Sequence, residues 1–394
     1  MNWSGVAFLG TRYLARHRRT TLLLVIAFTL VWLLPTSIAL VVGKVEEQLR
    51  SRAADTPLLL GHPGSPLELV FNGLYFTKPG LATLPLKEAT AAAEDGLAQS
   101  IPIYARFSAG GHRIVGTNLD YFRFRGLEIA EGRSLVRLGE CVVGAKVAEA
   151  NRLSPGDFIV SSPETLFDLA GVYPLKMKVS GILEPTGSPD DRAIFVDLKT
   201  AWIIEGLGHG HDEADELDDD QRLESSEEDE AVSLNASVME YNEVTPETMD
   251  RFHFHGDLED YPVTAAIVVP NDAKSRALVK GRYASDSSVQ LVSPERAMDE
   301  LFATVFSVQR FVIWLLGAIG AATIAIGALV FLLSHRLRQD EFRHLRQLGA
   351  DLATIRALVA FEAAFVVLAS LALSAVGLLA IEALAPMVIR ALIA

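Results

Sequence analysis

Two closely spaced histidine pairs are the residues whose types and spacing best suit metal chemistry. One pair is followed at once by two carboxylates, and the other alternates with phenylalanines. Zinc accepts neutral imidazole and carboxylate ligands, and histidines at alternate positions of a strand share one face. The alternative is a solvated acidic loop with incidental histidines. The sequence therefore predicts weak zinc binding by these residues: His209, His211, Asp212, Glu213, His253 and His255.

Other site chemistry has no support in the sequence. It has no glycine-rich loop ending in Gly-Lys-Ser/Thr, which would cradle a nucleotide phosphate. His-Glu-x-x-His and Gly-x-Ser-x-Gly motifs are also absent. The single cysteine, Cys141, excludes an internal disulfide and a cysteine-rich zinc site. We therefore expect a non-catalytic protein, and if ATP drives it, a separate subunit must bind the ATP and Mg²⁺.

A short segment between two hydrophobic stretches combines an apolar stripe with charges. Phe342, Leu345 and Leu348 are spaced three residues apart, which places them on one face of a helix, and Gly349 then ends it. Such a helix can insert into a groove of a partner protein, or it can simply cap a membrane span. The residues that would form its polar rim are Asp340, Glu341, Arg343, Arg346 and Gln347.

Glu362 is an acidic residue inside a hydrophobic stretch. A carboxylate is costly in lipid, so it should face protein or water. Proton relay is one conceivable role. The position favours an anchor near the cytoplasmic end, because Glu362 lies barely two turns into the predicted helix at 357–385.

These residues must be positioned by membrane helices, of which the sequence predicts three. The stretches 20–43 and 311–334 carry no charge, and 357–385 is interrupted by Glu362 and Glu382. Each reaches the roughly 20 apolar residues that a span requires. The first stretch is longer than the apolar region of a signal peptide, which favours a retained anchor.

Arginine clusters set the expected orientation. Residues 1–19 form a basic, aromatic-containing segment suited to an amphipathic helix in the headgroup layer. Because basic residues favour the cytoplasmic side, we expect 44–310 outside the cytoplasm, 335–356 inside, and a short tail at 386–394 outside. The arginines in question are Arg12, Arg16, Arg18 and Arg19 before the first span, and Arg336, Arg338, Arg343 and Arg346 after the second.

Composition agrees with a membrane protein. The 394 residues are 50% hydrophobic and carry a formal net charge of −14, and the mean hydropathy is +0.28. These values argue against a simple cytoplasmic enzyme, and the acidic balance argues against nucleic-acid binding. Twelve acids and one arginine at 209–230 supply most of the negative charge. We expect 206–231 to be a disordered acidic loop.

The region 44–310 predicts an α+β domain. Strand-like pieces at 103–107, 112–115, 158–161, 176–183 and 193–196 alternate with turn signals and with short helical pieces at 85–97 and 146–152. Later strands are expected at 263–269 and 289–292. Residues 44–50 continue the first span without a breaker, and 294–306 runs into the second, so two helical stalks are predicted.

Four features together carry a family resemblance. They are the segment VAFLGTRYLARHRRTTLLLVIAF, the stretch 115–202, the segment RLRQDEFRHLRQLGADLATIRALVAFEA, and the order of one span, a large outer domain and further spans. The chain resembles the permease subunits of the type VII ABC transporters, the MacB/FtsX/LolC group. The marks within 115–202 are Gly132-Arg133, Val143-Gly144, Gly156-Asp157, Gly181-Ile182 and the Asp190/Asp191 turn.

The resemblance implies a fold, partners and a location. It implies a MacB-type periplasmic core domain in a bacterial inner-membrane protein, an elbow helix at 1–19, and an ATPase-coupling helix carrying residues 340–349. It also implies a partner ATPase dimer and a second permease copy or related permease. The family usually has four spans, whereas 386–394 is too short to cross, so the chain is a three-span variant or lacks a fourth span.

The resemblance leaves the driven substrate open. ATP hydrolysis by the partner would move the periplasmic domains, a mechanism called mechanotransmission. That movement would act on a substrate, which could be a lipoprotein, a peptide, a small efflux molecule or a divalent metal. A periplasmic binding protein or lipoprotein is a further expected partner. The histidine insert suggests the FtsX-like permeases found beside zinc-responsive periplasmic proteins. The alternative is a transmembrane sensor or scaffold that binds a ligand without an ATPase.

Overall fold

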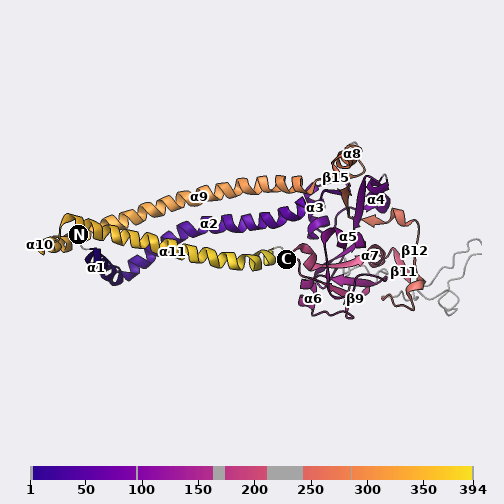
Figure 1. Ribbon diagram of the computed structural model, residues 1–394, viewed down its shortest axis with the longest axis horizontal. Helices are drawn as coiled ribbons and strands as arrows, with labels where there is room; N and C mark the ends of the chain where they lie inside the picture. Colours follow the sequence, from indigo (N-terminus) through magenta and orange to yellow (C-terminus); the bar gives the residue numbers. More distant parts are fainter. Residues whose placement is uncertain (1–2, 95, 163–173, 211–242, 285, 393–394) are drawn as a thin grey trace, which may run out of the picture. The chain divides into compact units, whose positions relative to one another are not determined.

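The computed structural model describes residues 3–94, 96–162, 174–210, 243–284 and 286–392. The chain divides into two compact units (Figure 1). The first unit comprises Met1–Arg50 and Glu300–Ala394, and the second comprises Ser51–Asp299. The two are described separately below.

The first unit is helical. Within the described residues, three helices are long and apolar enough to cross a membrane, which confirms the prediction of three such apolar helices. Two of them extend past their apolar stretches as predicted for stalks, and the last continues through Leu392, past the predicted end of the third span at 385. The helices are α1 (Trp3–Arg16), α2 (Arg18–Ala54), α9 (Pro294–Leu337), α10 (Gln339–Gln347) and α11 (Leu352–Leu392).

Hydroxyl groups join α2 to α11. Ser370 Oγ donates to the carbonyl of Val25 at 3.1 Å, and Ser374 Oγ donates to the carbonyl of Thr29 at 3.1 Å. Small hydroxyl residues allow close helix packing where lipid offers no hydrogen-bonding partner. Further along α11, Glu382 pairs with Lys44 of α2 at 3.2 Å, so this acidic residue also contacts protein.

The second unit contains a four-stranded antiparallel sheet in the order β15–β1–β14–β3. All four residues of β1 are buried, because this strand lies between two neighbours. Helices α3, α4 and α8 pack against the sheet. The bounds are β1 (Leu58–Gly61), β3 (Ala98–Ile103), β14 (Ala265–Pro270), β15 (Gln290–Val292), α3 (Pro66–Tyr75), α4 (Leu86–Glu94) and α8 (Ala273–Tyr283).

A mixed sheet of seven strands forms the rest of the core, in the order β4–β5–β10–β7–β9–β6 with β8 also on β9. The pairs β5–β10 and β7–β9 are parallel, whereas the others are antiparallel. The α+β prediction is confirmed, since both sheets share one hydrophobic core. The strands are β4 (Ser108–Ala109), β5 (His112–Thr117), β6 (Ile129–Gly132), β7 (Glu140–Val143), β8 (Phe158–Val160), β9 (Lys176–Leu183) and β10 (Ala193–Asp197).

Short helices and turns connect the strands of the mixed sheet. Helix α5 follows β5, α6 follows β7, and a 3-10 turn, η1, leads directly into β10. Two further 3-10 turns, η3 and η4, flank β12, and the pairs β11–β12 and β2–β13 form separate two-stranded ladders. The bounds are α5 (Leu119–Arg125), α6 (Ala145–Asn151), η1 (Pro189–Arg192), α7 (Leu198–Glu205), β11 (Gly208–Gly210), η3 (Met249–Arg251), β12 (Phe252–Phe254), η4 (Leu258–Asp260), β2 (Leu84–Pro85) and β13 (Pro262–Val263).

Two local predictions are corrected. The strand expected at 103–107 instead ends at Ile103, because the chain there leaves the four-stranded sheet and Tyr104 pairs with Gly116 of the mixed sheet. The disordered acidic loop expected from 206 is wrong for Gly208–Gly210, because these residues form β11 and pair with β12. The rest of the expected loop, from 211 to 231, lies outside the described residues.

Candidate functional site

Helix α10 forms the turn between α9 and α11 in the first unit. Its end has the geometry of a Schellman motif: Gly349 has φ +96°, its N–H bonds to the carbonyl of Arg346 at 3.0 Å, and the N–H of Ala350 bonds to the carbonyl of Leu345 at 3.0 Å. The prediction that Gly349 ends the helix is confirmed. A positive φ costs glycine little, so the chain can reverse here into α11.

The apolar face of α10 mainly contacts its own chain. Phe342 is only 6% exposed and belongs to a cluster with Val6 of α1 and Leu358 of α11. Leu345 packs against the same cluster, whereas Leu348 is 85% exposed. The expectation of one apolar stripe available to a partner is therefore wrong for Phe342, because α1 and α11 already cover that side of the helix.

The outward side of α10 is charged. The Asp340 and Arg343 side chains are 78% and 69% exposed and form an ion pair at 2.9 Å, one helical turn apart. Such an exposed pair adds little stability. Arg346 is also exposed, and Glu341, whose side chain is 65% exposed, pairs with Nε of Arg338 at 3.2 Å. The charges are therefore available for contacts outside this chain, with Leu348 as the apolar residue at the end of the helix.

A buried ion pair fixes the start of α10. Nη1 of Arg338 donates to the two carboxylate oxygens of Glu362 at 3.0 and 2.9 Å. The Arg338 guanidinium carbon lies 3.5 Å from the ring centroid of Tyr13 in α1 and 4.9 Å from that of Phe342. Both charged residues are less than 10% exposed. The Arg338–Glu362 clamp, as we call this pair, therefore joins the start of α10 to α11 and to α1.

Sequence reasoning singled out Glu362 and missed its partner. In the sequence, Arg338 belongs to the arginine cluster that predicts the orientation, and Tyr13 lies in the basic, aromatic-containing segment 1–19. Arg338 and Glu362 lie 24 residues apart on different helices, and no helical spacing links them. The only available signal was the cost of a lone carboxylate in a span, which requires some partner.

The predicted metal ligands are only partly brought together. The register of β11 with β12 places the backbone of His209 directly opposite His253. The rings of His253 and His255 lie 4.9 Å apart between centroids, at 86°. His253 Nδ1 donates to the carbonyl of Arg251 at 3.2 Å. His211, Asp212 and Glu213 lie outside the described residues.

A complete metal site is not present in the described part of the chain. Within those ranges, no group of three or more histidine, cysteine, aspartate or glutamate side chains is arranged to hold a metal ion. Zinc usually takes four ligands. The His253–His255 pair would therefore need ligands from elsewhere.

We predict that replacing both His253 and His255 by alanine weakens zinc binding by the full chain at least tenfold. The reason is that the two rings lie 4.9 Å apart between centroids and that zinc accepts imidazole ligands. Calorimetric titration with zinc would measure the change. The matched control is His62→Ala, an exposed histidine elsewhere in the same unit. Equal zinc affinity of the double variant and the wild type would exclude this pair as ligands.

The fold and the helices define a class of protein with three candidate membrane spans, among the described residues, and an α+β domain. The family model of the MacB-like periplasmic core domain matches residues 20–218. The chain therefore belongs to the MacB-like periplasmic core domain family. This finding confirms the resemblance to the MacB group, while the link to zinc-responsive systems stays a prediction.

Several solved structures are similar to this chain. The periplasmic region of MacB from Actinobacillus actinomycetemcomitans is 11% identical with a TM-score of 0.36, and the match covers 66% of this chain and 97% of that one. The extracellular domain of the noncanonic ABC-type transporter YknZ from Gram-positive bacteria is 12% identical with a TM-score of 0.32, covering 60% and 99%. A domain of a putative permease protein from Porphyromonas gingivalis is 11% identical with a TM-score of 0.25, covering 60% and 86%. Among curated proteins, none matches the chain.

Proposed function

We propose that this chain is the permease subunit of an ABC transporter in which a separate ATPase moves the second unit by mechanotransmission. Family membership and the three candidate spans support this proposal. The observation that carries it is α10, a short helix with a charged outer side, fixed at its start by the Arg338–Glu362 clamp. A sensor without an ATPase would have no need for such a helix between two spans.

The proposal includes a location and an assembly. Arginines next to the spans favour α1 and α10 on the cytoplasmic side of a bacterial inner membrane, and the second unit on the periplasmic side. Two permease chains, identical or related, would assemble with two ATPase copies. The driven substrate is a lipoprotein, a peptide, a small efflux molecule or a divalent metal.

A double change on the exposed side of α10 tests the proposal. We expect Asp340→Lys combined with Leu348→Asp to weaken ATPase binding by about 2 kcal/mol or more, since a few central residues dominate most interfaces. Leu345 is a poor probe because it packs against its own chain. Co-purification of the ATPase with the full chain in detergent would measure the loss.

The control for this test is Lys274→Glu, an exposed charge change on α8 of the second unit. It should leave co-purification unchanged. Undiminished ATPase binding by the α10 variant would remove this helix from the interface. Failure of the wild-type chain to bind any ABC ATPase would favour the sensor or scaffold alternative.

A further inference from the structure

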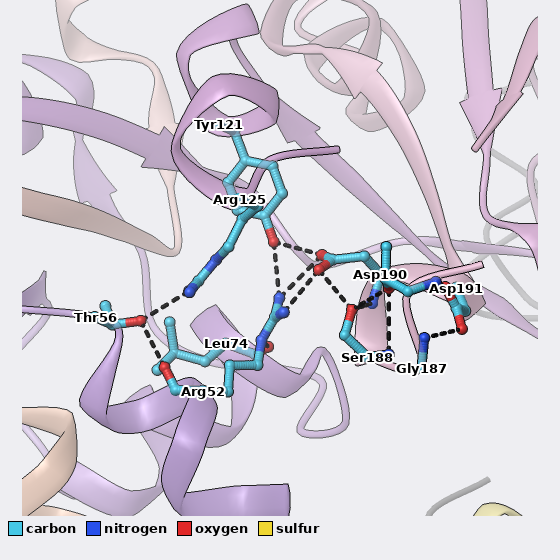
Figure 2. A network of polar contacts seen from close by, with 10 residues as sticks. Arg52, Thr56, Leu74, Tyr121, Arg125, Gly187, Ser188, Asp190 and Asp191 are labelled. Atoms are coloured by element: carbon cyan, nitrogen blue, oxygen red, sulfur yellow. Dashed lines mark hydrogen bonds and ion pairs between the residues drawn. The ribbon is translucent and has the colours of Figure 1, made fainter. Parts of the chain in front are cut away.

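The last turn of α2 carries an arginine that is buried in the second unit. Arg52 is 7% exposed and faces Asp190 of η1, which is 1% exposed. Nη1 of Arg52 donates to Oδ2 of Asp190 at 2.7 Å, and Nη2 donates to Oδ1 at 2.9 Å (Figure 2). This two-bond fork fixes the direction of both side chains as well as their distance.

The remaining donors of Arg52 are also used. Nε donates to the carbonyl of Leu74 at the end of α3, at 2.5 Å, and Nη2 donates to Tyr121 Oη of α5 at 2.8 Å. Tyr121 Oη in turn donates to Oδ1 of Asp190 at 2.6 Å. One side chain on α2 is thus bonded to three other elements of the second unit, α3, α5 and η1.

A second arginine holds the backbone of the same turn. Arg125 Nη2 donates to Thr56 Oγ1 at 2.8 Å, and this hydroxyl donates to the carbonyl of Arg52 at 2.9 Å (Figure 2). Burial and the nearby charge of Arg52 lower the pKa of Arg125. Burial alone would raise the pKa of Asp190, but the charge and hydrogen bonds of Arg52 and the bond from Tyr121 hold it below its usual value. Asp190 is therefore the ionised partner of the fork.

The turn that carries Asp190 is itself firmly held. The carboxylate of Asp191 accepts the backbone N–H groups of Thr186 at 2.8 Å and Gly187 at 2.9 Å. Gly144, before α6, approaches so closely that a Cβ there would lie 2.3 Å from the Asp190 carbonyl oxygen. Because η1 leads into β10, which pairs with β5 and β7, Asp190 is attached to the middle of the mixed sheet.

We propose that the Arg52–Asp190 pair is the joint through which movement of α2 reaches the mixed sheet of the second unit. This inference rests on the proposed mechanotransmission. Helix α2 begins in the first unit at Arg18 and ends in the second at Ala54, so its last turn is where any displacement must be passed on. Arg52 and Asp190 act as positioning residues, since each acts through the elements that it joins.

Stability alone is a weaker explanation of the pair. Buried ion pairs can often be replaced by apolar residues of similar volume without loss of stability, whereas removal of one partner is costly. The variant Arg52→Met/Asp190→Leu should therefore stay folded while lacking the directional fork. If the pair serves folding alone, this variant should hold α2 as firmly to the second unit as the wild type does. If the pair is the joint, the variant should hold α2 less firmly.

The experiment measures distances between two spin labels by pulsed electron paramagnetic resonance, in the full chain with its ATPase in nanodiscs. The labels occupy Glu47→Cys on α2 and Val136→Cys in the second unit, both exposed positions. Cys141 is buried and is replaced by serine as a precaution. In the wild type we expect a narrow distance distribution that shifts when vanadate traps the nucleotide.

The double variant should give a distribution at least twice as wide, with the nucleotide-dependent shift lost and the ATPase rate retained. The matched control is Asp120→Asn/Arg123→Gln, which removes an exposed ion pair of the same unit and should change neither width nor shift. If the double variant shows the same width of the distance distribution and the same nucleotide-dependent shift as the wild type, the proposed role of the pair as a joint is refuted.

The two hypotheses fail separately. If the distances in the wild type do not shift with nucleotide, mechanotransmission is refuted. The width of the distance distribution measured without nucleotide still tests the joint in that case. If the double variant does not fold, Arg52→Lys replaces it, since lysine keeps the charge but not the fork. A distance distribution as narrow in Arg52→Lys as in the wild type would then refute the proposed joint, and a broader distribution would support it.

Discussion

Replacement of Glu362 by alanine is expected to abolish co-purification of the ATPase while the second unit stays folded. The change removes the buried carboxylate partner of Arg338 and leaves only Glu341, a 65% exposed carboxylate 3.2 Å from Nε. Removing one partner of a buried pair typically costs about 3–5 kcal/mol. Because Arg338 begins α10 and contacts Tyr13 of α1, its displacement should also shift α10. The measurement is the amount of ATPase recovered with the tagged full chain.

The same helix supplies a matched control. Glu382 is another carboxylate of α11, but its side chain is 54% exposed and it pairs with a partly exposed Lys44. Such pairs contribute about 0–1 kcal/mol, so Glu382→Ala should leave co-purification intact. Glu362→Gln keeps a hydrogen-bond acceptor and should give an intermediate loss. Normal ATPase recovery with Glu362→Ala would show that the clamp does not position α10.

Features that depend on local sequence could be predicted. The three spans follow from apolar runs of sufficient length, and the stalk-like extensions follow from the lack of a helix breaker after Gly43 and from Pro294. Gly349 marked the end of α10 because a left-handed residue there favours glycine. In each case, the physical cause lies within a few residues of the feature.

The two buried ion pairs could not be predicted in the same way. The sequence marks Asp190 as part of a turn, but its partner Arg52 lies 138 residues earlier, on a candidate membrane helix. The spacing of Phe342 and Leu345 defined a helix face without indicating that α1 and α11 cover it. Sequence periodicity specifies which side of an element is apolar, whereas the tertiary fold determines what contacts it.

The second large effect is expected at Phe195 in the middle of β10. This side chain is fully buried, and its ring lies 5.4 Å from those of Tyr121 and Phe122 and 6.3 Å from that of Phe76. Phe195→Ala removes most of this aromatic contact and should lower the free energy of unfolding by about 3–5 kcal/mol. That is a large part of the roughly 5–15 kcal/mol that stabilises a typical protein.

Denaturant unfolding followed by tryptophan fluorescence would measure this loss, because Trp202 is the one tryptophan of the second unit and is buried. Leu278→Ala on α8 is the control: its side chain is 49% exposed, so the change should stay within about 0.5 kcal/mol. Equal unfolding midpoints for Phe195→Ala and wild type would show that this aromatic cluster does not stabilise the second unit.

Since Tyr121 contacts both Phe195 and Asp190, Phe195→Ala should also broaden the distribution of spin-label distances that reports on the joint, whereas Leu278→Ala should not.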